Sequence, residues 1–372
     1  MKMANDGAWI LIDDAEAEAQ SFADSLSAKS GIAVEVLKPA EARSMLLSGG
    51  RHPAGILVDV DLSSIAGETG TGPGIAQDIR VKQKAGSIPE YPLIRFAALA
   101  PVQKNVRGDP TSDDLFDLKI QKEAVGRDID SVISELRGIG EIYDALNGSE
   151  KIDDKFFQRI LGCTETDLDV VSHDGFRDRF LSSLQTAVHV AAGVFVRSFL
   201  TAPGLLIDKS LLAIRLGVDA QKSGEMWPKL LDSLPFRYGG IGHTYFSRWW
   251  ARGLDAWWFG KIDGIAPLVS LTSEQRIDLL QKKLGVEGLV ALQLPEGSPG
   301  SHPWRLCKLC LEQDLPVEFP IDATDAVRLT LKADLPIWVD PPYASLKFAC
   351  QEKDDLRVNR ADISRLLNKY KN

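Results

Sequence analysis

The sequence predicts two parts: an N-terminal α/β domain over residues 1–145, built on a doubly wound, five-stranded parallel sheet, and a mainly α-helical, tryptophan-rich domain over residues 146–372. Three observations predict this division. Short apolar segments alternate with helix-like segments in the first part. Helical spacing of apolar residues dominates the second part. Seven of the eight tryptophans fall between residues 227 and 338.

The composition is that of an ordinary globular protein. Of the 372 residues, 44% are hydrophobic and 26% are charged. The longest apolar runs are far shorter than the ~20 residues that cross a bilayer, and four cysteines are too few for a disulfide framework. We therefore expect a cytoplasmic protein that has no membrane association.

The net charge of −9 is concentrated in the N-terminal part, where residues 1–145 hold 15 Lys and Arg against 23 Asp and Glu. An acidic chain without a long basic run argues against nonspecific nucleic-acid binding.

Five apolar segments in the first part are expected to be strands. They are short and apolar throughout, which is typical of parallel strands buried on both faces. Helix-like segments separate them, so a sheet with helices on both faces is expected. The predicted strands are residues 8–12, 32–37, 54–60, 91–99 and 115–120, and the predicted helices between them include residues 15–27, 39–47 and 75–84.

Acidic residues follow two of these strands. Asp13 and Asp14 come after the first, and Asp59 and Asp61 come at the end of the third. The carboxyl ends of parallel strands form the ligand crevice, so these acids are expected to meet in space. Clustered carboxylates repel one another and require a divalent cation, for which Mg²⁺ suits hard oxygen ligands. Lys122, at the end of the fifth strand, would supply a positive charge opposite them.

These residues resemble those of a response-regulator receiver (CheY-like) domain over residues 8–145. The matching motifs are Asp13-Asp14 after Ile-Leu-Ile, Asp59 in Ile-Leu-Val-Asp-Val-Asp-Leu-Ser, and Lys122 in Leu-Phe-Asp-Leu-Lys-Ile-Gln-Lys. The resemblance implies that Asp59 is the phosphoacceptor and that Asp13 and Asp14 help it to hold Mg²⁺, with the backbone carbonyl of Asp61 as a further ligand. It implies that Lys122 contacts the phosphoryl oxygens. It also implies a partner protein, such as a histidine kinase or a signalling complex, and a homodimer formed through a sheet edge.

The sequence also departs from the receiver pattern. Ala97 or Ala98 stands where receivers carry a Thr or Ser after the fourth strand, and Glu123 stands where a proline normally follows the Lys. The segment 67–74 is a glycine-rich insertion that matches no nucleotide-binding motif. Two interpretations stay open: a phosphorylated receiver, or a degenerate receiver kept as a docking module.

The second part shows helical spacing over residues 156–161, 178–200 and 209–216, and 362–371 is a short closing helix. Residues 178–200 are apolar on several sides and predict one central buried helix.

Residues 209–234 resemble a helix-turn-helix, with Gly217 at the turn. Early residues of the second helix would then face base edges. Gly224 and Pro228 weaken that helix, which favours a plain helical hairpin. A DNA-binding response regulator therefore stays the alternative function, with DNA a less favoured partner. The candidate DNA contacts are Arg215, Gln221 and Lys222.

Tryptophans and arginines cluster near residue 250. Two interpretations apply: an aromatic surface that binds a partner, or a large aromatic core. The candidate interaction residues are Arg248, Trp249, Trp250, Trp257 and Trp258.

Catalytic signals are sparse in the second part. Cys307 and Cys310 form a single C-x-x-C with His302 upstream, but zinc commonly needs a second such pair. His243 follows glycines without a nucleophile motif nearby. We therefore expect a regulatory or binding protein rather than an enzyme.

Overall fold

The computed structural model describes residues 7–60, 62, 71–98, 115–148, 153–163, 175–262, 264–296, 298, 300–312, 320–330, 335–352 and 355–370. The chain forms two compact units: one of residues 1–200 with 239–246, and one of residues 201–238 with 247–372. The first unit thus extends past residue 145, the predicted end of the α/β domain. A separate domain that ends there stays a prediction.

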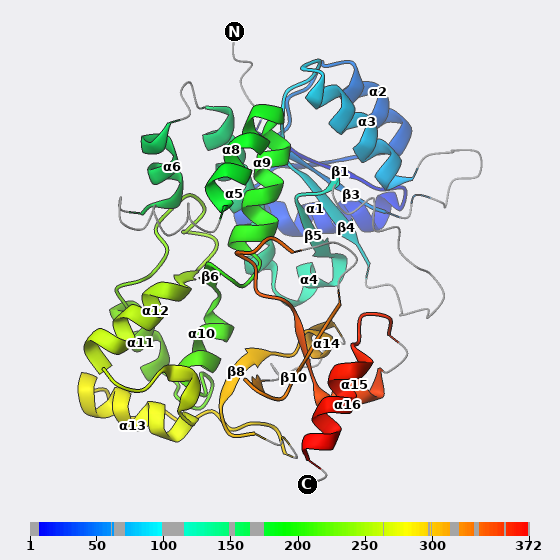
Figure 1. The fold of residues 1–372 in the computed structure, drawn as a ribbon. Coiled ribbons are helices and arrows are strands. Elements are labelled where there is room, and N and C mark those ends of the chain that lie inside the picture. Colours follow the sequence, from blue (N-terminus) through cyan, green and yellow to red (C-terminus); the bar gives the residue numbers. More distant parts are fainter. Residues whose placement is uncertain are drawn as a thin grey trace. The chain divides into compact units, whose positions relative to one another are not determined.

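The first unit contains a five-stranded, all-parallel sheet in the order β2-β1-β3-β4-β5 (Figure 1). This is the flavodoxin-like doubly wound order, which is also that of CheY-like proteins. The predicted α/β fold is confirmed. The strands are β1 (Trp9–Ile12), β2 (Val34–Leu37), β3 (Gly55–Val58), β4 (Leu93–Ala97) and β5 (Leu118–Gln121).

The central strands β1 and β3 are buried at every position, as continuous apolar runs predict. Their register places Trp9 beside Gly55. A Cβ added to Gly55 would lie 2.4 Å from the Trp9 ring, so only glycine leaves room for that ring against β3. The pairing of Trp9 with Gly55, the first pair between β1 and β3, therefore depends on the absence of a side chain at residue 55.

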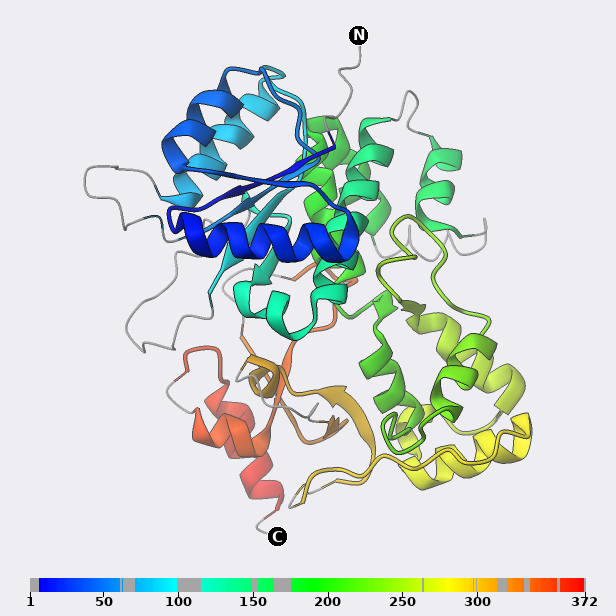
Figure 2. The same cartoon turned by 180° about the vertical axis from the view of Figure 1, so that it is seen from behind.

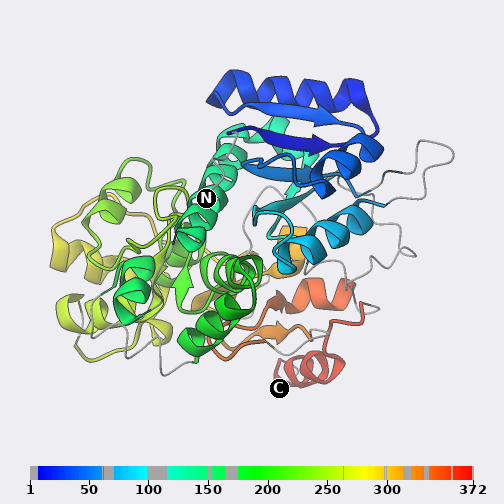
Figure 3. The same cartoon turned by 90° about the horizontal axis from the view of Figure 1, so that it is seen from above.

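Helices cover both faces of the sheet. Ile10 and Val58 pack in one core cluster with residues of α2 and α3. On the other face α1 packs against β2 and α5, and the rings of Phe22 and Phe96 meet edge to face at 5.4 Å. Seen from above, α1 and the α2–α3 pair lie on opposite sides of the strands (Figure 3). The helices are α1 (Glu16–Ser30), α2 (Pro39–Leu47), α3 (Gly72–Lys84), α4 (Lys122–Arg127) and α5 (Ile129–Asn147).

The rest of the first unit is helical: α6 (Asp154–Leu161), α8 (Phe176–Thr186), α9 (Val188–Phe195) and the π-helix η2 (Val196–Leu200). The single helix predicted for residues 178–200 is wrong. Ala187 is extended (φ −170°, ψ 152°) and separates α8 from α9. Five buried phenylalanine rings from these helices pack together, and α9 packs against α5. The rings belong to Phe157, Phe176, Phe180, Phe195 and Phe199.

The segment 239–246 returns to the first unit after the chain has entered the second. Its Ile241 amide donates to the Ile160 carbonyl of α6 at 2.8 Å. A Cβ on Gly138 of α5 would lie 2.4 Å from the Phe246 ring. The segment therefore packs directly against α5 and α6.

The second unit begins with a helical part that Figure 2 shows from behind in green to yellow. It comprises β6 (Leu206–Ile207), α10 (Lys209–Leu216), α11 (Met226–Ser233), β7 (Trp249–Trp250), α12 (Ala251–Trp257), η3 (Trp258–Ile262), η4 (Leu268–Ser270) and α13 (Ser273–Leu284). A capping box of Thr272 and Gln275 begins α13.

A C-terminal lobe follows in the same unit. Two small antiparallel sheets pair β8 (Pro303–Leu306) with β9 (Pro320–Asp322), and β10 (Ala326–Arg328) with β11 (Tyr343–Ser345). They pack with α14 (Lys308–Glu312), α15 (Leu346–Gln351) and α16 (Arg360–Lys369). In the described part of the chain, no helix has the length and apolar character needed to span a membrane.

Candidate phosphoacceptor site

Three of the predicted site residues lie at the carboxyl ends of three strands. Asp13 directly follows β1, Asp59 directly follows β3, and Lys122 begins α4 immediately after β5. The Lys122 Nζ atom lies 2.7 Å from Asp13 Oδ2 and 2.7 Å from Asp59 Oδ2. The ammonium group of Lys122 thereby contacts two carboxylates that are far away in the sequence. Asp13 lies 109 positions before Lys122, and Asp59 lies 63 positions before it.

Local backbone contacts hold the two carboxylates in place. The Asp13 Oδ1 atom accepts a hydrogen bond from the Ala15 amide at 2.8 Å, which orients the side chain at the turn into α1. The Asp59 amide donates to the Ile12 carbonyl at 2.9 Å and extends the pairing of β1 with β3. The two acids therefore stand on adjacent strands at the same edge, as the sheet order requires.

The cluster is buried: the exposed fractions of the Asp13, Asp59 and Lys122 side chains are 0%, 11% and 7%. Burial by itself lowers the pKa of Lys122, but the hydrogen bonds and negative charges of Asp59 and Asp13 outweigh it and raise that pKa above its ordinary value. Lys122 is therefore a fixed positive charge that compensates two buried carboxylates.

The donor set fits a divalent cation. One carboxylate oxygen from each of Asp13, Asp14 and Asp59 lies within 4.8 Å of the others. Mg²⁺ takes hard oxygen ligands, commonly one or two carboxylates together with waters and the oxygens of a phosphate. Asp61, the fourth predicted ligand, lies outside the described residues.

The first turn of α3 packs against the backbone of Asp59. A Cβ added to Gly72 would lie 1.9 Å from the Asp59 carbonyl oxygen and 3.0 Å from the Val60 Cα. Thr71 caps the helix by accepting from the Gly74 amide at 3.2 Å. Part of the glycine-rich segment thus has a role in packing, while residues 67–70 lie outside the described part.

The position expected to carry a hydroxyl is occupied by alanine. Ala97 ends β4 and is half-buried, and Ala98 follows it and is exposed. Neither side chain donates or accepts a hydrogen bond. The alanines that replace the Thr or Ser of the receiver pattern therefore lie at the end of β4, as the sequence predicts.

No family model and no curated protein matches this sequence. Solved structures that are similar include a CheY-like receiver domain from Methylobacillus flagellatus, 15% identical over 35% of this chain and 98% of that chain, with a TM-score of 0.26. The phosphorylated cyanobacterial phytochrome response regulator RcpA is 18% identical over 37% and 94%, with a TM-score of 0.26. NtrX from Brucella abortus, solved in complex with ATP, is 12% identical over 57% of this chain and 47% of that chain, with a TM-score of 0.27.

The sheet order and its strand-end acids decide the fold. The N-terminal α/β part is a receiver fold. Its five parallel strands, its helices on both faces and its cluster of Asp13, Asp59 and Lys122 at the carboxyl edge are all present in one compact unit.

Sequence reasoning missed a second buried polar cluster in the receiver. Arg80 of α3 donates to Asp117 Oδ2 at 2.7 Å, and the Tyr143 hydroxyl of α5 donates to both Asp117 oxygens at 3.0 Å. Burial alone lowers the pKa of Arg80, yet Asp117 and Tyr143 raise it on balance. One signal was available: Arg80 falls on the apolar stripe of α3, four residues after Ala76.

The candidate aromatic residues of the second unit divide into buried and half-buried groups. Trp249 and Trp258 are buried in its core, and the Trp258 indole donates to the Ala266 carbonyl at 3.0 Å. Trp250 and Trp257 are half-buried and pack on the rings of Tyr238 and Phe236. Arg248 is half-buried, and its guanidinium donates to the Ser247 carbonyl at 2.9 Å. An interaction surface of these five residues stays a prediction.

The expected recognition helix does not begin where the helix-turn-helix pattern places it. The second helix, α11, begins at Met226, and Gln221 and Lys222 lie in turns before it. The Asp219 amide donates to the Val290 carbonyl at 2.8 Å. This segment therefore pairs with the extended stretch around residue 290, where Val218 and Ala291 form an antiparallel bridge. Arg215 pairs with Asp340 at 2.9 Å, and its side chain is 11% exposed.

The cysteine and histidine candidates do not converge on one site. Cys307 and Cys310 are buried at the start of α14, and a hydrogen bond from Cys310 lowers the pKa of the Cys307 thiol below its ordinary value. His302 contacts Asp322 instead, with 3.7 Å between Nδ1 and Oδ2. His243 is exposed, and its Nδ1 donates to the Gly240 carbonyl at 2.9 Å.

Proposed function

We propose that this chain is a signalling regulator whose receiver accepts a phosphoryl group on Asp59 and thereby controls what its second unit binds. The observation that carries the proposal is the position of Lys122 Nζ, 2.7 Å from both Asp13 and Asp59. Asp14 lies in the same cluster. A buried nucleophilic carboxylate beside a lysine and two further acids suits transfer of a phosphoryl group to an aspartate.

In this proposal, an oxygen of Asp59 attacks the phosphorus of a phosphodonor such as a kinase phosphohistidine or acetyl phosphate. The bond from phosphorus to the leaving group breaks, and the leaving group departs with the electron pair. Lys122 then pairs with the phosphoryl oxygens while it keeps its contact with Asp13. Asp13, Asp14 and Asp59 would hold Mg²⁺, which would supply positive charge that reduces the repulsion between the phosphoryl group and the acids.

A hydroxyl after β4 cannot transmit the phosphorylation of Asp59 to the rest of the chain, because that position is alanine. The conformational change must therefore use another contact. Gly72 provides such a contact. The backbone of Asp59 is packed directly against the first turn of α3, so a shift of Asp59 moves that turn. The partner protein and a homodimer formed through the sheet edge belong to the same proposal.

Intact-mass spectrometry tests the phosphoacceptor. The full chain is incubated with acetyl phosphate and Mg²⁺, and the mass of one phosphoryl group is sought. We expect the adduct on the wild type and on Asp24→Asn, which changes an exposed acid on α1. We expect none on Asp59→Asn, and none on the wild type when EDTA removes Mg²⁺.

Peptide mapping of the adduct gives the second readout. A phosphoryl group on a residue other than Asp59 overturns the assignment. A folded wild type without any adduct favours a receiver used only for docking, in which case Asp59→Asn leaves partner capture unchanged.

A further inference from the structure

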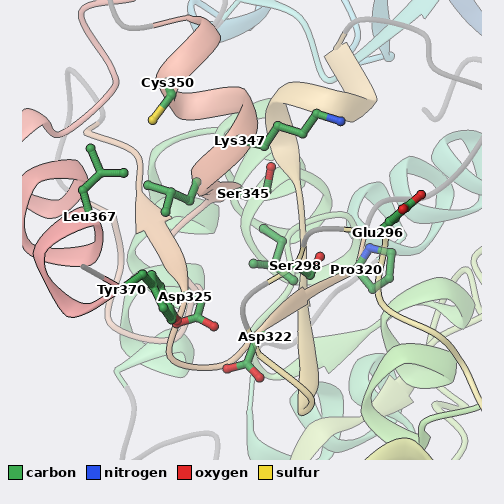
Figure 4. A pocket seen from close by; sticks show the side chains of 12 residues that line it. Glu296, Ser298, Pro320, Asp322, Asp325, Ser345, Lys347, Cys350, Leu367 and Tyr370 are labelled. Carbon is green, nitrogen blue, oxygen red and sulfur yellow. The ribbon is translucent and has the colours of Figure 1, made fainter. Parts of the chain in front are cut away.

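The C-terminal lobe of the second unit contains a cavity of about 350 Å³ that the receiver chemistry does not use (Figure 4). This volume lies in the range of pockets that hold small ligands. Its walls come from β9 and the turn after it, from α15, from α16, and from the segment before β8. The residues used below are Ile321, Asp322, Asp325, Leu346, Lys347 and Cys350.

One carboxylate in the cavity wall has an unsatisfied oxygen. The Asp325 side chain is 3% exposed. Its Oδ1 atom accepts from Lys369 Nζ at 3.0 Å, from Thr324 Oγ1 at 3.2 Å and from the Tyr370 hydroxyl. Its Oδ2 atom has no hydrogen-bond partner among the residues that the structure describes. A buried acceptor without a donor is costly, so this oxygen is suited to a donor from a ligand.

The acidic character of the cavity extends beyond Asp325. Asp322 also lines the cavity. Burial by itself would raise the pKa of Asp322, but the hydrogen bonds that the Thr324 and His302 amides donate lower that pKa on balance. The carboxylate of Asp322 therefore stays ionised. Glu296 adds a third acid. Figure 4 shows the two aspartates on one side and the amino group of Lys347 on the far side, extending away from them.

Apolar side chains supply the rest of the wall. Ile321 is 4% exposed, Leu346 is half-buried, and Leu367 of α16 adds a third aliphatic group. A ligand body that lacks charge would pack against these groups. The cavity thus combines an acidic end, where Asp325 Oδ2 has no donor from the described part of the chain, with an aliphatic surface.

We propose that this cavity binds a small organic cation, with an ammonium or amidinium group that donates to Asp325 Oδ2 and an apolar body that packs on Ile321 and Leu346. A charged donor fits better than a neutral one, because Asp322 and Asp325 together hold more negative charge than Lys369 compensates. This site is independent of Asp59.

Benzylamine is a suitable probe, since it is protonated at neutral pH and carries an apolar ring. Binding to the full chain is measured by saturation-transfer NMR and by calorimetric titration. We expect benzyl alcohol, which has the same shape without the charge, to bind at least about tenfold more weakly. Equal binding of the amine and the alcohol overturns the proposal.

Asp325→Asn keeps the size of the side chain and removes its charge. We expect it to weaken benzylamine binding about tenfold or more, whereas Asp278→Asn, an exposed position on α13, leaves binding unchanged. A folded Asp325→Asn protein that binds benzylamine as the wild type does overturns the proposal.

A measurement on the wild type avoids dependence on the stability of that variant. Cys350 lines the cavity and is exposed, whereas Cys163 is half-buried and lies in the first unit. N-ethylmaleimide labelling of each cysteine is followed by peptide mass spectrometry. Benzylamine is expected to slow labelling of Cys350 and not of Cys163. Labelling of Cys350 at an unchanged rate, or equal slowing at both cysteines, overturns the proposal.

Discussion

Glu90 caps a helix that begins almost a hundred residues later, through contacts with His189. The carboxylate accepts from the His189 amide at 2.8 Å and lies 2.7 Å from His189 Nδ1, and it also accepts from the Val188 amide at 3.1 Å. The N-cap residue Ala187 has no side-chain acceptor to offer. Glu90, which precedes β4, therefore supplies the missing cap and joins the receiver sheet to α9.

Replacing Glu90 with Gln is expected to lower the free energy of unfolding by about 1–2 kcal/mol at neutral pH, because a neutral amide is a weaker cap at a helix N-terminus. Urea denaturation measures this loss. Glu18→Gln, at an exposed position on α1, serves as the control and should change stability by less than about 0.5 kcal/mol.

The contribution of Glu90 should depend on pH. Burial raises the pKa of Glu90, but the bonds to His189 outweigh it and hold the pKa below its ordinary value of 4.5. A group whose pKa is lowered by folding stabilises the protein fully above its unfolded pKa, and this stabilisation is lost as the pH falls through the folded value. The stability difference between wild type and Glu90→Gln should therefore shrink below pH 4.5. A difference that stays constant down to pH 3 would contradict this assignment.

Asp117→Asn should be among the most damaging substitutions in the receiver. It leaves the buried charge of Arg80 without its carboxylate, at a cost of about 3–5 kcal/mol. Tyr143→Phe removes only a hydroxyl donor and should cost about 1–2 kcal/mol. Chemical denaturation of the two variants, with the exposed Asp24→Asn as control, checks the order; the reverse order would show that Tyr143 rather than Arg80 holds the cluster together.

Gly72→Ala should displace the backbone of Asp59, the proposed phosphoacceptor. Its Cβ would overlap the Asp59 carbonyl oxygen, whereas a Cβ on Gly74 would only approach the Thr71 hydroxyl at 3.4 Å. We expect Gly72→Ala to lose at least about 1 kcal/mol and to take up the phosphoryl group more slowly. Gly74→Ala should be neutral or stabilising by up to about 1 kcal/mol, as expected for a glycine in a helix. Equal behaviour of the two variants would remove Gly72 from the site.

Arg276→Lys should destabilise the second unit by at least about 2 kcal/mol. The fully buried guanidinium donates to four backbone carbonyls on three separate segments, and a lysine cannot reproduce this fork. Arg328→Lys, at an exposed strand position, should have little effect. Thermal and urea unfolding provide the comparison. The four acceptors are the carbonyls of Leu268, Ile214, Arg215 and Pro303.

The α/β fold and the meeting of Asp13 and Asp59 at one edge of the sheet were predictable because their signals are local. A strand buried on both faces needs a short apolar run, and Asp13 and Asp59 each follow one directly. The parallel order then brings the strand ends together without further information. The network of Arg80 was harder to foresee, since nothing near residue 80 indicates that Asp117 will face it.

The errors in the second half arise from contacts between distant segments. The predicted helix over residues 178–200 breaks at Ala187, where Glu90 caps a new helix from far away in the sequence. The expected second helix near residue 219 is replaced by turns because Asp219 and Ser223 bond to Val290. The helical spacing of apolar residues carries no information about either of these contacts with distant residues.

The return of residues 239–246 to the first unit has a consequence for how this protein can be divided. Cutting the chain at residue 145 or 200 would separate Phe246 from Gly138, and the cut at residue 200 would also separate Ile241 from its hydrogen-bond partner Ile160. Neither unit is one continuous stretch of sequence. A receiver fragment ending at either point would expose apolar surface on α5, so a soluble module for transplantation into other proteins has to carry this later segment with it.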